Sequence, residues 1–213
     1  MLKLAKFTFY MFGINTYVVY DPEMKEAAVI DPGMSRREEF EAMEKFIARE
    51  NLTVRHLVNT HLHIDHAIAD KWVGEKYGIP VEAHEDDATL GLILAQQAQR
   101  FGIRGVDTKI EIGHRLKEGD TISIGSGSLR VLHVPGHSQG SIALYDKEDG
   151  FVIVGDTLFE GSIGRTDLMG GDHAQLIRAI SEKLLTLPGD TVVYPGHGNP
   201  TTVEWEKEHN PYL

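Results

Sequence analysis

The chain has 213 residues, of which 41% are hydrophobic and none is cysteine. This size and apolar content predict one compact domain, and the lack of cysteine excludes disulfides, thiolate metal ligands and cysteine nucleophiles. A formal net charge of -11 disfavours a nucleic-acid partner, because binding to phosphate backbones depends on Lys and Arg. Without a membrane-length apolar run or a signal-peptide core, we expect a cytoplasmic protein that does not bind membranes.

The first third of the chain predicts strands over residues 2–9, 14–20 and 26–30, joined by turn signals such as Asp21-Pro22. These strands are expected to be successive antiparallel neighbours. Ser35 is a candidate N-cap with Glu38 three residues later, and the apolar spacing that follows predicts an amphipathic helix ending near Glu50.

The middle of the chain alternates between strand and helix patterns. The prediction is a strand at 56–59, a helix at 69–77, a strand at 80–83 and a second helix from about 86 to 100. Apolar residues between Thr89 and Val106 lie near the expected mouth of the active site. Their helical spacing favours core packing over a substrate lid.

The sequence after Ile110 is rich in β-strand patterns. We predict strands at 121–124, 128–134, 141–145 and 151–154, and then a helix from about 173 to 187, a strand at 192–194 and a short helix after Thr201. Two β-rich halves with flanking helices predict an α/β fold in which two sheets pack face to face with helices outside.

Four potential metal ligands stand close together directly after the strand expected at 56–59. The motif Thr-His-Leu-His-Ile-Asp-His spans residues 60–66 and contains His61, His63, Asp65 and His66. Alternate side chains leaving a strand converge on one ion, while the next two can turn toward a second. Nitrogen and oxygen ligands without sulfur favour a catalytic site.

Three further candidate ligands follow later strands. They occur in Pro-Gly-His, Gly-Asp-Thr and Pro-Gly-His-Gly sequences and are His137, Asp156 and His197. Because strand exits from a common sheet edge lie close in space, we expect these side chains to meet the first cluster, with glycines allowing sharp bends. The remaining histidines are expected to make ordinary structural contacts, except that His173 is left open: His56, His84, His114, His133, His173 and His209.

The four motifs, in this order and spacing, resemble the metallo-β-lactamase superfamily across essentially the whole chain. The resemblance implies a four-layer α/β/β/α sandwich and two divalent metal ions, with Zn²⁺ favoured and Fe or Mn also compatible with these ligands. It also implies that Asp156 bridges the metals, that the first metal is bound by His61, His63 and His137, and that the second is bound by Asp65, His66 and His197.

Among the branches of this superfamily, the chain is most similar to the short form of glyoxalase II, notably over residues 196–213. That resemblance implies a small-molecule thioester such as S-lactoylglutathione, cleaved by metal-bound hydroxide with Asp65 and Asp156 as catalytic carboxylates. Arg165 stands where longer glyoxalases place a glutathione-binding Lys. It is either a substrate-binding residue or the partner of Asp167 in a structural ion pair. The acyl group, the thiol and the oligomeric state stay open.

The main alternative comes from the Gly-Arg-Thr-Asp sequence at residues 164–167, which also occurs in persulfide dioxygenases. In such a mononuclear iron oxygenase, the iron would be bound by His61, His137 and Asp156. The complete second ligand set favours the hydrolase, although those relatives often retain it too. A non-enzymatic scaffold is disfavoured by the same intact set.

Overall fold

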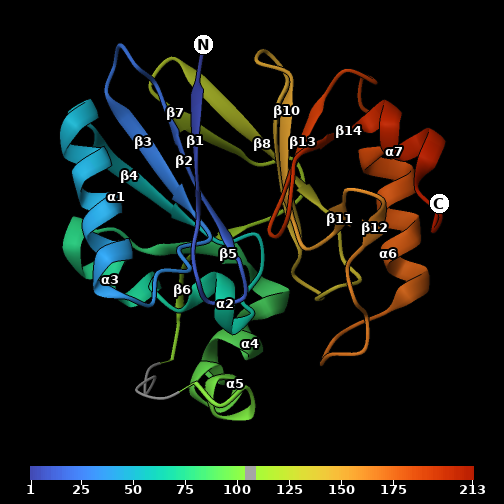
Figure 1. The fold of residues 1–213 in the computed structure, drawn as a ribbon, viewed down its shortest axis with the longest axis horizontal. Helices are drawn as coiled ribbons and strands as arrows, with labels where there is room; N and C mark the ends of the chain where they lie inside the picture. The colour runs from blue at the N-terminus through green and yellow to red at the C-terminus, as the bar shows by residue number, and fades with distance from the viewer. Residues whose placement is uncertain (104–108) are drawn as a thin grey trace.

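The computed structural model of the protein describes residues 1–103 and 109–213. Two six-stranded sheets face each other (Figure 1). In spatial order, the first contains β1 (Lys3–Thr8), β2 (Asn15–Tyr20), β3 (Glu26–Ile30), β4 (Thr53–Val58), β5 (Val81–His84) and β6 (Ile112–Leu116). The second contains β14 (Thr201–Thr202), β13 (Val192–Pro195), β10 (Phe151–Gly155), β9 (Ile142–Asp146), β8 (Gly127–His133) and β7 (Thr121–Ile124).

Helices cover the outer faces of both sheets (Figure 1). The first sheet is flanked by α1 (Arg37–Glu50) and α3 (Asp70–Tyr77), and the second by α6 (His173–Ala179), the π-helical turn η2 (Ile180–Leu184) and α7 (Val203–His209). The predicted α/β/β/α layering is therefore confirmed. The other short elements are α2 (Ile64–Ala67), η1 (Glu85–Asp87), α4 (Ala88–Leu92), α5 (Leu94–Arg100), β11 (Leu158–Phe159) and β12 (Ser162–Ile163).

Strand β2 shows how one sequence supplies two hydrophobic cores. Its side chains alternate, so that Tyr17 and Val19 enter the core between the sheets while Val18 and Tyr20 pack in the core that includes Met43 of α1. Because it contributes to both cores, β2 is buried throughout. A third core lies between the second sheet and its helices, and a fourth lies under α4 and α5.

Most predicted elements of the first third are present, and β1, β2 and β3 pair antiparallel as expected. The predicted N-cap of α1, Ser35, was wrong by one residue. Arg36 is the N-cap, because the carboxylate of Glu39, not Glu38, accepts the backbone N–H groups of Ser35 and Arg36 at 2.8 and 3.0 Å.

The helix predicted over 86–100 was also wrong, because the chain leaves helical geometry at Ile93, where φ is -101° and ψ is 19°. Gly91 is a weak helix former, and its carbonyl accepts the N–H of Ile110 at 2.9 Å. Leu90 and Leu94 are buried as core packing predicted, whereas Phe101 is 43% exposed. The end of that segment, through Val106, lies outside the described residues.

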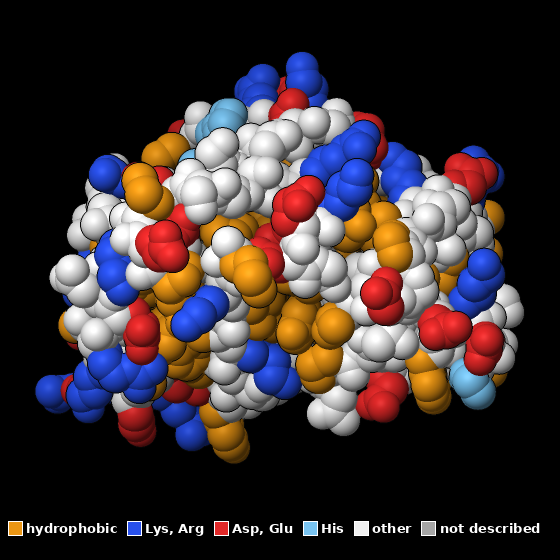
Figure 2. All heavy atoms as spheres, turned by 90° about the horizontal axis from the view of Figure 1, so that it is seen from above, with side chains coloured by type: hydrophobic (Ala, Val, Ile, Leu, Met, Phe, Trp, Pro, Cys, Tyr) orange, Lys and Arg blue, Asp and Glu red, His pale blue; other side chains and the backbone are white. Residues whose placement is uncertain are grey.

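None of the helices among residues 1–103 and 109–213 is long and apolar enough to cross a bilayer. Figure 2 looks down on the end of the molecule where the chain begins. Acidic and basic side chains are interspersed on that face, and apolar side chains are visible toward its middle.

Candidate metal centre

The exits of four strands bring the predicted ligands together at one end of the sandwich. The first cluster follows β4, and the later ligands follow β8, β10 and β13. Two glycines make this possible. Gly155 turns the chain after β10 with φ of +52°, and at Gly196 a Cβ would lie 2.3 Å from Oδ1 of Asp156. The expected role of glycine at the strand exits therefore holds at these two positions.

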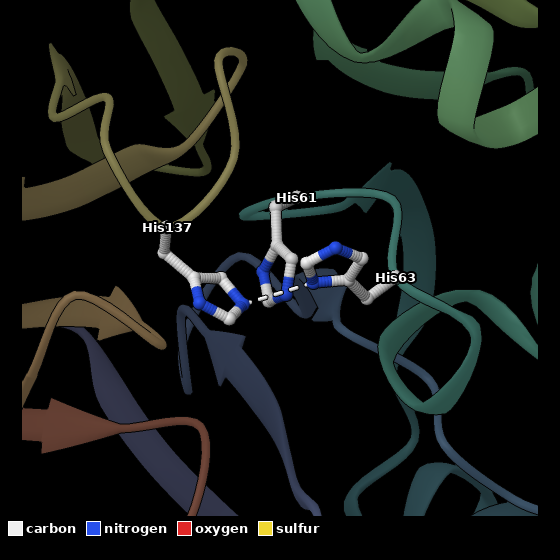
Figure 3. Close-up of side chains that lie close together, drawn as sticks. All are labelled: His61, His63 and His137. Atoms are coloured by element: carbon white, nitrogen blue, oxygen red, sulfur yellow. Dashed lines mark hydrogen bonds between the residues drawn. The ribbon is translucent and has the colours of Figure 1, made fainter. Parts of the chain in front are cut away.

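The first ligand group consists of three buried histidines, His61, His63 and His137. Their rings point toward one another from the loops after β4 and β8 (Figure 3), and Nδ1 of His63 lies 2.9 Å from Nε2 of His137. Burial, together with the neighbouring imidazoles, holds the pKa of His61 well below its ordinary value. Burial and His137 lower the pKa of His63 to about 3. Both rings are therefore neutral near pH 7, as metal ligation requires.

The second group contains Asp65, His66 and His197, whose candidate ligand atoms all lie within 4.8 Å of one another. Nε2 of His197 is 3.2 Å from Oδ2 of Asp65, and Nε2 of His66 is 4.0 Å from the same oxygen. Burial alone would lower the pKa of His66, but the nearby carboxylates, first that of Asp156, outweigh it and raise that pKa well above its usual value. This pocket of negative charge favours a cation.

Asp156 lies between the two groups. Its Oδ1 is 3.3 Å from Nε2 of His66, and its Oδ2 is 3.5 Å from Nε2 of His197 and 3.8 Å from Nε2 of His137. Although burial opposes its ionisation, the surrounding imidazoles, first His66, keep its pKa below the usual range. The structure thus brings all seven predicted residues together, with a carboxylate positioned to contact both groups.

The unused polar atoms of this cluster fit a metal centre. Within the described part of the chain, Nε2 of His61, Nε2 of His66 and Oδ1 of Asp156 are buried and make no hydrogen bond. Leaving such atoms unpartnered in a protein interior costs free energy. Because they face one another across the two groups and are nitrogen or carboxylate donors, the residues fit divalent metal ions, whose identity the ligand types leave open.

The other ring nitrogens of four histidines are held by groups that sequence reasoning missed. Nδ1 of His66 lies 2.9 Å from Oδ2 of Asp31, and Nδ1 of His61 lies 3.2 Å from Oγ1 of Thr60. Nδ1 of His137 donates to the carbonyl of Arg165 at 2.8 Å, and that of His197 to the carbonyl of Phe12 at 3.1 Å. Such outer partners fix the tautomer and orientation of ligating histidines.

Two of these partners adopt left-handed backbone conformations, with φ of +51° at Asp31 and +58° at Phe12. Asp31 also accepts the backbone N–H and the hydroxyl of Thr60 at 2.7 and 2.6 Å, so it fixes the start of the ligand loop. The sequence offered one signal for Asp31, which is its place in Asp-Pro-Gly directly after a strand. Nothing in the sequence signals the carbonyl of Phe12.

A buried carboxylate outside the cluster joins the two loops that carry the first ligand group. Asp87 accepts the N–H of Leu62 at 3.0 Å, the hydroxyl of Ser138 at 2.8 Å and the N–H of Gly140 at 2.7 Å. Leu62 stands between His61 and His63, and Ser138 follows His137. Asp87 therefore holds the two loops in register, a role that sequence reasoning also missed.

A cavity of about 230 Å³ opens beside the ligand cluster, and we refer to it as the central pocket. Its lining includes the ligands His63, Asp65, Asp156 and His197, and it also contains four apolar side chains, Phe12, Ile64, Phe101 and Leu168. Arg165 reaches it, but its guanidinium makes two hydrogen bonds to Asp167, at 2.6 and 2.7 Å. The ion-pair interpretation of Arg165 is therefore the arrangement present in the structure.

Several histidines outside the motif make the ordinary contacts expected of them. His56 and His114 both bond the carboxylate of Glu82, and His209 stacks on Trp205. The rings of His84 and His133 stack at 4.0 Å with an interplanar angle of 8°. Nitrogens of two parallel rings cannot both aim at one ion, since a metal lies in the plane of each ligating imidazole. His173 is exposed at the start of α6.

Comparison with known proteins agrees with this geometry. The sequence profile described as the Metallo-beta-lactamase superfamily matches residues 10–197, so the chain belongs to that superfamily. It is 36% identical over 203 residues to "Hydroxyacylglutathione hydrolase GloC" of Haemophilus influenzae, covering 95% of this chain and 93% of the relative. It is 40% identical over 200 residues to "Probable metallo-hydrolase YqgX" of Bacillus subtilis, covering 93% and 92%. The chain is accordingly a metallo-hydrolase of this superfamily.

Solved structures show the same fold. A crystal structure of BLEG-1 B3 metallo-beta-lactamase is 36% identical with a TM-score of 0.89, covering 99% of both chains. TTHA1623 in a di-iron-bound form is 34% identical with a TM-score of 0.86, covering 98% of this chain and 100% of that one. ETHE1 from Myxococcus xanthus is 27% identical with a TM-score of 0.79, covering 98% and 83%.

Proposed function

We propose that the protein is a glyoxalase II-like thioesterase that hydrolyses S-lactoylglutathione or a related small thioester at two divalent metal ions. The observation that carries the proposal is the juxtaposition of two complete ligand groups that share Asp156 and face one pocket. The similarity to a hydroxyacylglutathione hydrolase along nearly the whole chain supports the same choice of substrate class.

The residues that would hold the metals are His61, His63 and His137 in the first group, Asp65, His66 and His197 in the second, and Asp156 between them. Metals bound there would supply a water whose pKa is lowered toward neutrality, and Lewis acidity toward the substrate carbonyl. Zn²⁺ is the ion we favour, with Fe or Mn as alternatives that the same ligands accept.

The chain itself supplies proton acceptance and an apolar wall. Asp65 lies on the wall of the central pocket, and its carboxylate is the group that would accept the proton of the attacking water. Phe12, Phe101 and Leu168 make part of the wall of the same space apolar. A thiol has a pKa near 8 to 9, so a thiolate leaves readily and requires little help from a general acid.

The test is hydrolysis of S-lactoylglutathione by purified protein whose metals are counted, beside a β-lactam substrate. Rapid thioester cleavage with about two metals per chain is the expected result. Hydrolysis of the β-lactam with no thioester cleavage would instead assign the chain to β-lactam chemistry and overturn the proposal.

A persulfide dioxygenase is the second candidate. It is favoured by the Gly-Arg-Thr-Asp sequence at residues 164–167 and by the similarity to the ETHE1 structure. In that reaction a single iron would be held by His61, His137 and Asp156. Oxygen uptake on glutathione persulfide, with one iron per chain and no thioester cleavage, would select this function over the thioesterase.

A further inference from the structure

A second cavity, of about 190 Å³, adjoins the central pocket, and we call it the side pocket. It lies between α4, α5 and the loop that carries residues 168 and 169. Its lining is mainly apolar and includes Leu90, Ile93, Phe101, Leu168 and Met169, with Arg100 as its cation.

The two cavities adjoin one another. His63, Phe101 and Leu168 line both of them, so the side pocket begins at side chains that also border the space beside the metal ligands. The rings of Phe12 and Phe101, which both line the central pocket, meet edge to face with centroids 5.9 Å apart. Phe101 thus contributes apolar surface to both cavities.

The buried amide of Gln97 in the wall of the side pocket is already engaged. It donates to the carbonyls of Leu62 and Leu90 at 3.1 and 2.9 Å, and its oxygen accepts the N–H of Ile64 at 3.1 Å. Because these bonds satisfy Gln97, it offers little to a ligand. The part of the side pocket formed by Gln97 and its apolar neighbours therefore suits methylene groups, whose burial is favoured by the hydrophobic effect.

Among the described residues that line the side pocket, Arg100 carries a positive charge, although the protein as a whole is acidic. Arg165 is neutralised by Asp167, whose pKa is lowered to about 2 by this pairing, with a smaller contribution from the charge of Arg100. Asp167, Arg165 and Arg100 together carry one net positive charge. Arg100 lines the side pocket and is exposed, so its guanidinium is accessible to a carboxylate in solution.

We propose that the side pocket binds the thiol half of the substrate, as an apolar segment that ends in a carboxylate bound by Arg100. This inference rests on the proposed thioesterase function and adds the class of thiol. The volume accommodates about six methylene-sized groups, if each takes roughly the 30 Å³ of a water molecule. The central pocket retains the carbonyl and a short acyl group.

The experiment compares the lactoyl thioesters of 6-mercaptohexanoic acid and 6-mercaptohexanol, which differ only at the terminal group. Rates are measured with metal-loaded wild type, Arg100→Gln, Arg100→Lys and the control Arg178→Gln, which removes an exposed Arg from α6. S-lactoylglutathione is assayed alongside. We expect wild type to prefer the carboxylate by about two- to fivefold in kcat/KM, mainly through KM, because an ion pair formed by an exposed arginine is weakened by solvent.

Loss of this preference in Arg100→Gln, with Arg100→Lys retaining most of it and Arg178→Gln all of it, would support the inference. Equal rates on the two thioesters in wild type, or an equal decrease on both in Arg100→Gln, would overturn it while the thioesterase function stands. If metal-loaded wild type cleaves neither these thioesters nor S-lactoylglutathione, both proposals fail.

The apolar part of the inference has its own test in Met169→Gln. This side chain is 48% exposed, so the substitution is not expected to unfold the protein. We expect kcat/KM to fall about threefold for both hexyl thioesters and to stay unchanged for the lactoyl thioester of mercaptoacetate, which is too short to reach Met169. An equal decrease for the short and long thioesters would contradict binding of the long chain in this pocket.

Discussion

Two groups of histidines and carboxylates in the described part of the chain behave differently. One is the candidate metal centre, and the other joins His56, Glu82 and His114 on the adjacent strands β4, β5 and β6. Both place imidazoles around a carboxylate that is largely shielded from water. Composition alone does not separate them, although His114 is 62% exposed while His61 and His66 are fully buried.

The difference lies in where the nitrogens point. In the β4–β6 cluster, His56 contacts Oε1 of Glu82 at 2.6 Å and the carbonyl of Ser123 at 3.0 Å, and His114 contacts Oε2 of Glu82 at 2.8 Å. Both carboxylate oxygens are thereby used. In the metal centre, protein groups bond the outer nitrogens of four histidines, whereas Nε2 of His61, Nε2 of His66 and Oδ1 of Asp156 face the common space without hydrogen bonds. Buried ligand atoms that converge without hydrogen-bond partners therefore distinguish the metal centre.

The largest expected effect follows from removing the carboxylate that faces both ligand groups. Asp156→Ala should lose metal binding and reduce thioester hydrolysis to background together, with the fold largely formed. Metal content, turnover and circular dichroism measure the three properties. Glu82→Gln is the matched control, because it removes the charge of the other cluster's carboxylate, and it should keep both metals and activity. Full metal content with near-normal turnover in Asp156→Ala would contradict a bridging role.

A smaller loss is expected from the group that orients one ligand. Asp31→Asn replaces one of the two carboxylate oxygens that bond Thr60 and His66, and Asn tolerates the left-handed backbone at this position. Removing an outer partner of a ligand lowers metal affinity or activity by about 10- to 100-fold. Metal titration followed by kinetics at saturating metal separates these two effects. Unchanged metal affinity and turnover would show that His66 does not depend on Asp31.

The contrast between the two clusters also explains what the sequence could predict. His61, His63, Asp65 and His66 are adjacent in one motif, and the rule that strand exits share an edge sufficed to place the other ligands. The groups that orient them could not be predicted in the same way. The contact of His197 with the carbonyl of Phe12 spans 185 residues and involves no side chain of Phe12, so no residue type signals it.

The fold also contains parts that the sequence could predict and parts that it could not. Strands with strong alternation were located to within a few residues, because burial on one or both faces dictates their pattern. The break at Ile93 and the short strand β6, which was not predicted, depend on contacts with distant segments. Ile110 bonds the carbonyl of Gly91, and β6 pairs with β5 although three of its five residues are exposed. Those contacts carry no local signature in the sequence.

Metal binding should stabilise the fold through the candidate metal centre and not through the β4–β6 cluster. A ligand that binds only the native state adds about 2.7 kcal/mol at a hundred times its dissociation constant. We expect Zn²⁺ to raise the Tm of chelator-treated wild type and of Glu82→Gln by similar amounts, and to leave Asp156→Ala nearly unchanged. Differential scanning calorimetry with and without Zn²⁺ measures this. An equal increase in Asp156→Ala would place the stabilising ion elsewhere.

The smallest expected effect belongs to the β4–β6 cluster and depends on pH. The hydrogen bond to Glu82 raises the pKa of His56, against the opposing effect of burial. Since the folded-state pKa is the higher one, the pair contributes its full stability below the unfolded-state pKa of about 6.5 and loses it as pH rises through the folded-state pKa.

His56→Gln should therefore destabilise the protein more at pH 6 than at pH 8.5, by about 1 kcal/mol or less, because the ring is partly exposed to solvent. Urea unfolding of variant and wild type at each pH isolates this difference, since the other titrating groups cancel in the comparison. His173→Gln, at an exposed histidine of α6, is the control and should show no such change. A larger loss for His56→Gln at pH 8.5 would mean that the neutral ring, through its contact with Ser123, dominates the cluster's stability.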